Sequence, residues 1–206
     1  WVYAIKIIKK IKFNQYNFQS VTVESFDSLV TYLIIGIMVG GRLGYVFFYN
    51  FQFFFYNPVE IAKIWKGGMS FHGGLFGVVI ATIIFSKFKK NNFFKFTDIV
   101  SCVAPIGLFF GRIANFINAE LYGKISEAPW AIIFFEEENF GRHPSQIYEA
   151  ILEGIVLFLI LNFLAFYNKK IFISGYISGS FLILYSILRI FSEIFREPDV
   201  HIGYIY

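Results

Sequence analysis

Five apolar segments dominate this sequence and restrict the folds that are open to it. Each has about 18–23 residues, the length that a helix needs to cross the ~30 Å hydrocarbon core of a bilayer. Of the 206 residues 57% are hydrophobic and 16% are charged, against about 25% charged residues in a typical soluble domain. We therefore predict an all-α, polytopic membrane helical bundle that forms a single integral membrane domain over residues 1–206. The predicted spans are 28–49, 69–86, 98–117, 146–167 and 173–195.

The charges of the loops predict how these spans are oriented. Lysines cluster before the first span, between the second and third, and between the fourth and fifth, and the positive-inside rule places such loops in the cytoplasm. Loops 50–68 and 118–145 then lie outside, and the second is long enough to form a small extracytoplasmic head. Its apolar run 130–135 is either a strand or an interfacial anchor. Lysines beside apolar runs are typical of membrane flanks, so the net charge of +4 does not indicate a nucleic-acid-binding protein.

The first eight residues are apolar except for Lys6 and are too few to span a bilayer. Lysines follow this stretch instead of preceding it, which differs from the order in a signal peptide. Trp1 also stands where a methionine is expected. We therefore expect residues 1–8 to be the start of a truncated first span.

Cysteine and histidine usage predicts neither a metal site nor a metal cofactor. Cys102 is the only cysteine of the chain, which excludes an internal disulfide and a thiolate metal site. His72, His143 and His201 are far apart in sequence and lack metal-ligand spacing.

Six ionisable side chains fall inside or at the edge of the predicted spans. Burial of such groups in lipid is costly, so an ionisable residue there predicts a functional site by default. With the orientation given above, all six lie in or near the outer half of their span and would form a polar cavity open toward the outer leaflet. They are Arg42, Arg112, Glu149, Glu153, Arg189 and Glu193.

Helical spacing groups several of these residues, and each grouping has a structural alternative. Tyr185, Arg189 and Glu193 are four residues apart and share a helix face. Arg189 and Glu193 therefore form either part of a functional site or a plain intrahelical ion pair. Arg42 is either part of the polar cavity or a structural partner of one of the two glutamates in the fourth span.

Two short motifs lie where a predicted span meets the outer loops. The run 111–123 places a guanidinium group, two amides and a carboxylate at the end of an apolar segment. The run 67–75 places His72 beside two glycines. An imidazole there can transfer a proton near neutral pH, although a histidine that only packs between helices would have the same surroundings.

A third motif, 142–149, is typical of a loop that enters a helix. Pro144 stands where the first turn would begin, and Ser145 and Gln146 are able to satisfy free backbone amides there.

Taken together, these motifs resemble the prolipoprotein diacylglyceryl transferase family of the bacterial cytoplasmic membrane. The run 111–123 matches the signature of that family throughout, and the resemblance covers about residues 28–203. It implies a helical bundle of seven spans with a small outer head. It also implies the reaction: the diacylglyceryl group of phosphatidylglycerol moves to the thiol of the lipobox cysteine of a prolipoprotein, and glycerol phosphate leaves. The other matching blocks, in the order of the family, are 40–45, 67–75, 142–149 and 185–199.

The resemblance also implies which residues bind the substrates. Arg112 would bind the phosphatidylglycerol headgroup, and Asn115 would help to fix Arg112. Gly123 matches a position where a side chain would crowd the backbone, and Arg42 is a further candidate for substrate binding. The implied partners are phosphatidylglycerol, a lipobox peptide and the membrane.

The implied catalytic residues are fewer. Arg189 would be a second clamp on the phosphate, and His72 would be the general base toward the thiol. Tyr185 would hydrogen-bond to His72 or to the headgroup. Glu120 would fix the head loop, and either Glu120 or an unaided thiolate could replace His72.

The sequence departs from the family at both ends, and other functions compete with the enzyme. The family has a complete first span and a last span that returns the chain to the cytoplasm, whereas nothing follows Tyr206 here. An inactive fragment or scaffold of the family is therefore one alternative. A small anion transporter is a weaker one, because it predicts charges throughout the membrane depth and a repeat between the two halves. The charges instead gather toward one leaflet, and no repeat is visible.

Overall fold

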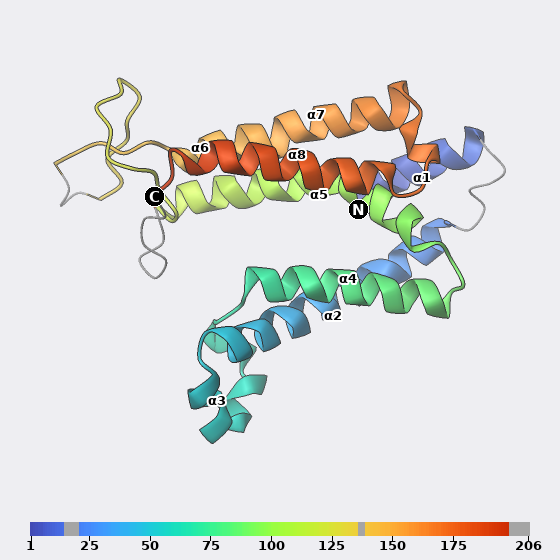
Figure 1. Ribbon diagram of the computed structural model, residues 1–206, viewed down its shortest axis with the longest axis horizontal. Coiled ribbons are helices and arrows are strands. Elements are labelled where there is room, and N and C mark those ends of the chain that lie inside the picture. Colours follow the sequence, from blue (N-terminus) through green and yellow to red (C-terminus); the bar gives the residue numbers. More distant parts are fainter. Residues whose placement is uncertain (15–20, 136–138, 198–206) are drawn as a thin grey trace. The chain divides into compact units, whose positions relative to one another are not determined.

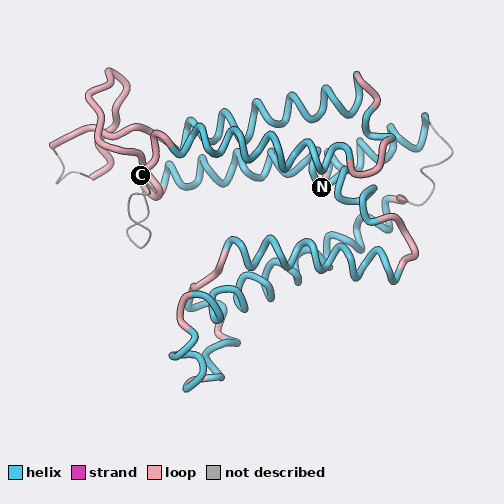
Figure 2. Tube along the Cα trace, viewed as in Figure 1, coloured by secondary structure: helices cyan, strands magenta, loops and turns pink. Residues whose placement is uncertain are grey.

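A computed structural model of the chain shows an all-helical protein and describes residues 1–14, 21–135 and 139–197 (Figures 1 and 2). Four of its helices are long and apolar enough to cross a membrane. Among the predicted features, His201 and the end of the last motif block, 198–199, lie outside the described residues. The helices are α1 (Val2–Asn14), α2 (Val23–Phe48), α3 (Phe51–Tyr56), η2 (Pro58–Ala62), η3 (Ile64–Lys66), α4 (Phe71–Phe88), α5 (Phe93–Ile117), α6 (Ser145–Glu149), η4 (Ala150–Val156), α7 (Leu157–Asn162), η5 (Phe163–Tyr167), η6 (Lys170–Phe172) and α8 (Tyr176–Glu193).

The four apolar helices fall on the first four predicted spans. They are α2, α4, α5 and the continuous helical stretch Ser145–Tyr167. The fifth predicted span contains α8, whose 18 residues include Arg189 and Glu193, and α8 is not one of the four. By its contacts the chain divides into two compact units, Trp1–Thr97 and Asp98–Tyr206, and the two are described separately below.

In the first unit, α2 and α4 pack through glycines. A Cβ atom added to Gly36 would lie 2.6 Å from the carbonyl oxygen of Gly77, and one added to Gly44 would lie 2.7 Å from the Cα of Gly73. Since only glycine leaves room for such backbone contact, the glycines allow these two helices to approach closely.

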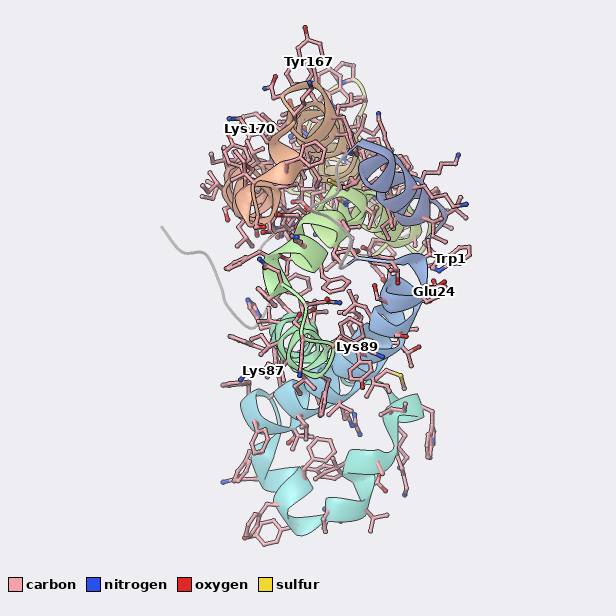
Figure 3. The ribbon with its side chains drawn as sticks, turned by 90° about the vertical axis from the view of Figure 1, so that its right-hand side faces the viewer. Trp1, Glu24, Lys87, Lys89, Tyr167 and Lys170 are labelled. Carbon is pink, nitrogen blue, oxygen red and sulfur yellow. The ribbon has the colours of Figure 1, made fainter. Side chains whose placement is uncertain are left out.

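The N-terminal helix of this unit is longer than the apolar stretch 1–8. It runs as α1 through the lysines to Asn14. The indole N–H of Trp1 donates a hydrogen bond of 2.6 Å to Asp27 near the start of α2, whose first turn contains Glu24 (Figure 3). At the same end of the unit, Lys87 and Lys89 mark the end of α4 (Figure 3).

In the second unit, α5, α7 and α8 run side by side (Figures 1 and 2). The stretch Ser145–Tyr167 is not a uniform α-helix, because η4 and η5 are π-helical. Such wide turns are frequent at functional sites. Here η4 carries Glu153, one of the ionisable residues singled out in the sequence.

Asp98 on α5 fixes the start of α8. Gly175, the residue before α8, has no side chain with which to cap the helix. The fully buried Asp98 carboxylate does so instead: it accepts hydrogen bonds from the backbone N–H of Gly175 at 2.7 Å and of Ser178 at 2.8 Å. This cap sets the position of α8, and hence of Arg189, relative to α5.

The loop between α5 and α6 forms a small lobe at one end of the second unit (Figure 1). Isolated bridges hold it together, among them Gly123 with Arg196 and Ile132 with Arg142. The run 130–135 is therefore not a strand over the described residues, although Ile132 takes part in a bridge. Trp130 is 60% exposed, which leaves the interfacial anchor as the interpretation of this run. Glutamates 136–138 of the lobe lie outside the described residues.

Candidate functional site

Two arginines and two buried glutamates meet in the second unit. Arg112 comes from α5 and Arg189 from α8, and the carboxylates of Glu149 and Glu153 lie between them. Arg112 Nε is 2.7 Å from Glu149 Oε2, and Arg112 Nη2 is 3.5 Å from Glu153 Oε2. Arg189 Nη1 is 3.1 Å from Glu149 Oε1 and 3.4 Å from Glu153 Oε1. We call these four residues the ion cluster.

Burial makes this arrangement energetically demanding. Glu149 and Glu153 are fully buried, and a carboxylate removed from water is stable only when it is paired. Each of the two glutamates contacts both arginines, so each buried charge has two partners. Ion pairing between the buried carboxylates and the two guanidinium groups therefore holds the cluster together.

The arginines keep donors that these carboxylates do not use. Both oxygens of Glu149 lie within ion-pair distance, yet neither accepts a well-aligned hydrogen bond within the described residues. In the same part of the chain, Arg112 Nη1 and Arg189 Nε contact no acceptor. The side chains of Arg112 and Arg189 are 16% and 22% exposed, so an anion could reach the free N–H groups.

Three further residues extend the cluster on the side of α8. Glu193 pairs with Arg189 Nη2 at 2.6 Å, so the predicted intrahelical ion pair is present and adds to the contacts with the buried glutamates. Ser192 donates a 3.3 Å hydrogen bond to Glu153, and Arg196 lies 3.8 Å from Glu193. Ser192 and Arg196 were not among the predicted site residues, although both lie in the matching block 185–199.

Asn115 lies in the last turn of α5, and Glu120 follows the helix where the chain enters the lobe. Asn115 Nδ2 donates a 3.1 Å hydrogen bond to Glu120 Oε2, and Asn115 follows Arg112 by three residues on the same helix. Gly123 lies where two backbone segments approach: an added Cβ would be 2.5 Å from the carbonyl oxygen of His143 and 2.6 Å from that of Phe195. The predicted crowding at Gly123 is therefore confirmed.

Tyr185 precedes Arg189 by one helical turn on α8. Its ring stacks on Phe181, with the centroids 5.7 Å apart and the planes 9° from parallel. Its hydroxyl has no hydrogen-bond partner among the described residues.

Arg42 and His72 belong to the first unit. All five N–H groups of Arg42 donate to backbone carbonyls, which include those of Ile61 at 2.9 Å and Glu60 at 2.7 Å. Arg42 is 5% exposed, and through these backbone carbonyls it holds the segment between α3 and α4 in place. His72 is exposed in the first turn of α4, and its ring is in edge contact with Phe71.

The helix-entry motif behaves differently from the prediction. Pro144 precedes α6 and makes no side-chain cap. Ser145 and Gln146 do not satisfy free amides of the helix. They donate instead to the carbonyl oxygens of Leu121 and Glu120 in the lobe, at 3.1 and 2.7 Å. The motif thus ties the start of α6 to the end of α5.

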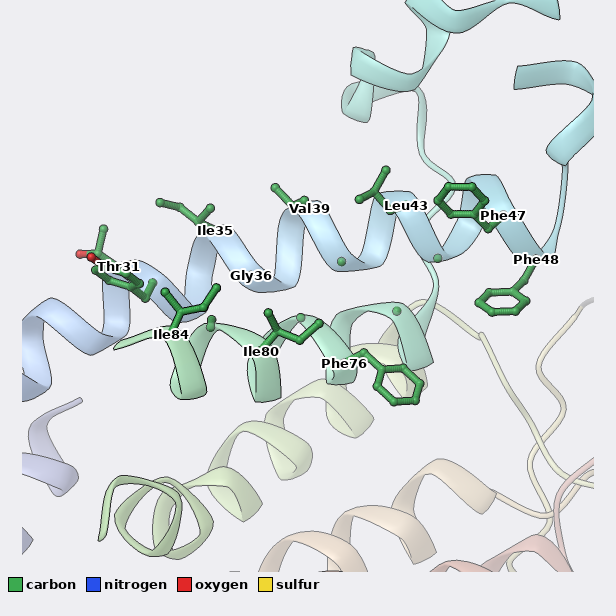
Figure 4. Close-up of a pocket in the computed structure, with 16 residues that line it drawn as sticks. Thr31, Ile35, Gly36, Val39, Leu43, Phe47, Phe48, Phe76, Ile80 and Ile84 are labelled. Carbon is green, nitrogen blue, oxygen red and sulfur yellow. The ribbon is translucent and has the colours of Figure 1, made fainter. Parts of the chain in front are cut away.

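The first unit also contains an apolar groove between α2 and α4, with a volume of about 700 Å³ (Figure 4). Its lining includes Ile35, Leu43, Phe76 and Ile80, and none of the charged residues considered above. Over residues 1–14, 21–135 and 139–197, no group of three or more His, Cys, Asp or Glu side chains could hold a metal ion.

Comparison with known proteins decides the family. A model of the prolipoprotein diacylglyceryl transferase family matches residues 1–205. The chain belongs to this family. A phosphatidylglycerol–prolipoprotein diacylglyceryl transferase from Rickettsia bellii (strain OSU 85-389) is 53% identical over 206 residues, which cover all of this chain and 76% of the relative. Relatives of the same name from Rickettsia felis and Rickettsia typhi are 51% and 50% identical over 205 residues, with 77% of each relative covered.

Membership makes the chain a transferase, and the four apolar helices make it a multi-pass membrane protein. In this transferase, the structure brings together Arg112, Arg189 and the two buried glutamates, with Asn115 and Glu120 at the end of α5. Chemically, such an arrangement presents guanidinium N–H groups to an anion at a site that is mostly shielded from water. The roles of the individual residues in catalysis and binding remain predictions.

Proposed function

We propose that this transferase moves the diacylglyceryl group of phosphatidylglycerol to the thiol of the lipobox cysteine of prolipoproteins, in the cytoplasmic membrane of a bacterium. The names of its relatives support both substrates. The four apolar helices support an enzyme whose lipid substrate reaches it from the bilayer. The observation that carries the proposal is the ion cluster, in which two arginines from different helices converge and keep free N–H donors.

The reaction needs help mainly at the phosphate. The thiol loses its proton, since only the thiolate is nucleophilic and the free thiol has a pKa of ~8.5. Sulfur then forms a bond to the glyceryl carbon while the bond from that carbon to the phosphate oxygen breaks, and glycerol phosphate leaves with the electron pair. Negative charge therefore grows on the phosphate in the transition state, where fixed N–H donors contribute most.

The ion cluster suits this task because its arginines are fixed before substrate arrives. A guanidinium group binds phosphate oxygens through two parallel N–H groups. Glu149 and Glu153 hold both arginines by charge, while Arg112 Nη1 and Arg189 Nε stay free for the phosphate. In the proposed role, Arg112 binds the headgroup and Arg189 stabilises the leaving phosphate.

The acceptor of the thiol proton is a separate part of the proposal. His72 is the proposed general base, with Glu120 as the alternative, and Tyr185 is proposed to hydrogen-bond to the base or to the headgroup. These roles rest on the resemblance of residues 67–75, 111–123 and 185–199 to the family. Unchanged turnover after His72→Gln would remove His72 from the mechanism.

A gel-shift assay tests the proposed function. Membranes that contain the chain receive phosphatidylglycerol and a lipobox peptide, and the lipidated peptide is separated by its mobility. Arg112→Lys keeps the positive charge beside the buried glutamates but loses the two-pronged N–H geometry, so we expect the rate to fall by about 100-fold. Lys169→Gln, at an exposed lysine before η6, is the matched control and should keep the wild-type rate. Absence of lipidated peptide from wild-type membranes would contradict the proposal.

A further inference from the structure

The turn that carries Glu120 has an unusual backbone. Ala119 and Leu121, on either side of Glu120, have φ angles of +54° and +55°. Residues other than glycine rarely adopt this left-handed conformation, because Cβ comes too close to the following carbonyl oxygen. Two such residues within one turn persist only where the surrounding structure holds them, and strained turns of this kind gather at functional sites.

Three hydrogen bonds from neighbouring elements hold this turn. The side-chain amide of Gln146 donates to the carbonyl oxygen of Glu120 at 2.7 Å, and the hydroxyl of Ser145 donates to that of Leu121 at 3.1 Å. The N–H of Glu120 donates to the carbonyl oxygen of Asn115 at 2.8 Å. Gln146 and Ser145 are fully buried, so the two donor groups are shielded from water.

The held turn directs the Glu120 carboxylate back to α5. Glu120 is exposed, yet its Oε2 accepts a 3.1 Å hydrogen bond from Asn115 Nδ2. Asn115 lies one helical turn from Arg112 of the ion cluster. Without the bonds from α6, the turn could relax to an ordinary backbone conformation, and the carboxylate would leave this position.

Gln146 has a further property that a purely structural residue would not need. Its Oε1 is buried and has no hydrogen-bond partner among the described residues. A buried polar atom without a partner is costly. The side-chain amide of Gln146 is therefore only half used in hydrogen bonding. The one bond that it makes within the described part of the chain is the bond from Nε2 to the carbonyl oxygen of Glu120.

We propose that Gln146 is a positioning residue for the transfer reaction: with Ser145, it holds the strained turn 119–121 so that Glu120 faces Asn115 and the end of α5 that carries Arg112. This inference rests on the proposed function. The start of α6 then affects the reaction by positioning Glu120, without itself contacting the substrate.

The test combines one variant that removes the hydrogen bond from Gln146 with a second that relieves the backbone strain at Ala119. Gln146→Leu removes the donor while keeping a side chain of similar size. Ala119→Gly removes one methyl group and permits a positive φ without strain, so the turn should keep its conformation with fewer bonds. Ala114→Gly, in the regular part of α5, is the matched control, because it adds the flexibility of glycine where the backbone is already helical.

We expect Gln146→Leu to lower kcat for the lipobox peptide by about tenfold and to leave KM for phosphatidylglycerol within about twofold. Ala119→Gly should recover at least about half of the lost rate in the Gln146→Leu background, whereas Ala114→Gly should recover none. Hydrogen exchange of the segment 115–123 gives a readout that does not depend on activity. Gln146→Leu should speed the exchange of the Glu120 amide, and Ala119→Gly should reverse this.

Two outcomes would overturn the inference. One is a wild-type kcat in Gln146→Leu. The other is equal recovery by the two glycine variants, which would indicate general flexibility instead of relief at Ala119. Failure of the proposed function is recognised separately, because the wild-type chain itself would then give no lipidated peptide; the positioning role would fall with it, even if the exchange rates changed as expected.

Discussion

At the scale of single residues, a buried ion pair and a solvent-exposed ion pair contribute differently to the stability of the fold. Glu149 and Glu193 both pair with Arg189, at 3.1 and 2.6 Å. The side chain of Glu149 is 1% exposed and that of Glu193 is 48% exposed. The shorter contact is therefore the one that water can replace, so its length does not indicate its importance.

This contrast gives a prediction with a built-in control. Glu149→Gln should lower the free energy of unfolding by about 3–5 kcal/mol, because it removes one partner from a buried ion pair. Glu193→Gln should lower it by at most about 1 kcal/mol, as for other exposed pairs. Denaturant unfolding of the purified proteins in detergent measures both values. Equal losses in the two variants would show that Glu149 is solvated, contrary to the ion cluster described above.

Glu60 gives a prediction that depends on pH. Hydrogen bonds from Lys63 and Lys66 lower the pKa of Glu60 from its usual 4.5 to about 2. A lowered pKa in the folded state means that these pairs stabilise the fold above about pH 4.5, and that the contribution is lost as the pH falls toward 2. The difference in Tm between the wild type and Glu60→Gln should therefore be small, fully present at pH 7 and much reduced at pH 2, where Glu60 is partly protonated in the folded state. A difference that grows as the pH falls would contradict the assignment.

At the scale of helices, the contact between α2 and α4 depends on which glycines face the partner helix. Gly77 and Gly74 lie on the same helix, three residues apart. A Cβ on Gly77 would overlap the backbone of Gly36, whereas the nearest atom to a Cβ on Gly74 is 3.9 Å away.

Alanine substitutions should separate these two positions. Gly77→Ala should destabilise the pair by about 1–3 kcal/mol through overpacking. Gly74→Ala should be neutral or stabilising, since alanine favours a helix over glycine by about 1 kcal/mol. Thermal unfolding in detergent, followed by circular dichroism, gives the comparison. Similar Tm values for the two variants would mean that the helices do not approach at Gly77.

The sequence predicted the site residues of these helices where a charged side chain stands in an apolar segment. Arginines and glutamates within apolar segments were recognisable because lipid makes them expensive, and the ion cluster consists of four of them. A hydrogen bond from a side chain to a backbone carbonyl cannot be recognised in this way, because every residue has a carbonyl. The five carbonyl acceptors of Arg42, and the carbonyl acceptors of Ser145 and Gln146, could not be found from residue types.

Other features were beyond the sequence because they depend on tertiary packing. The π-helical turns η4 and η5 have no pattern of their own in an apolar helix. Ser192 and Arg196 join the network only because of where α8 ends relative to the buried glutamates. The lobe folds through isolated bridges between residues that are distant in sequence. Its sequence does not show the alternation of apolar and polar residues that predicts a strand.

At the scale of the whole molecule, the family and the fold class agree with the sequence prediction. The match to the transferase family covers residues 1–205, and the described residues form an all-helical, multi-pass membrane protein. The predicted site residues are divided between the two compact units: Arg42 and His72 are in the first, and the other six are in the second. The second unit thus contains the complete ion cluster, and the account of phosphate binding depends on that unit.

Lipid binding tests this account most directly. The purified chain in detergent is titrated with short-chain phosphatidylglycerol and, separately, with diacylglycerol, which has the same chains and no phosphate. If the ion cluster binds the phosphate, the wild type should bind phosphatidylglycerol at least about tenfold more tightly, and Arg112→Lys and Arg189→Lys should each remove most of that preference. Equal affinity of the wild type for the two lipids, or a preference that survives both substitutions, would contradict phosphate binding by the ion cluster.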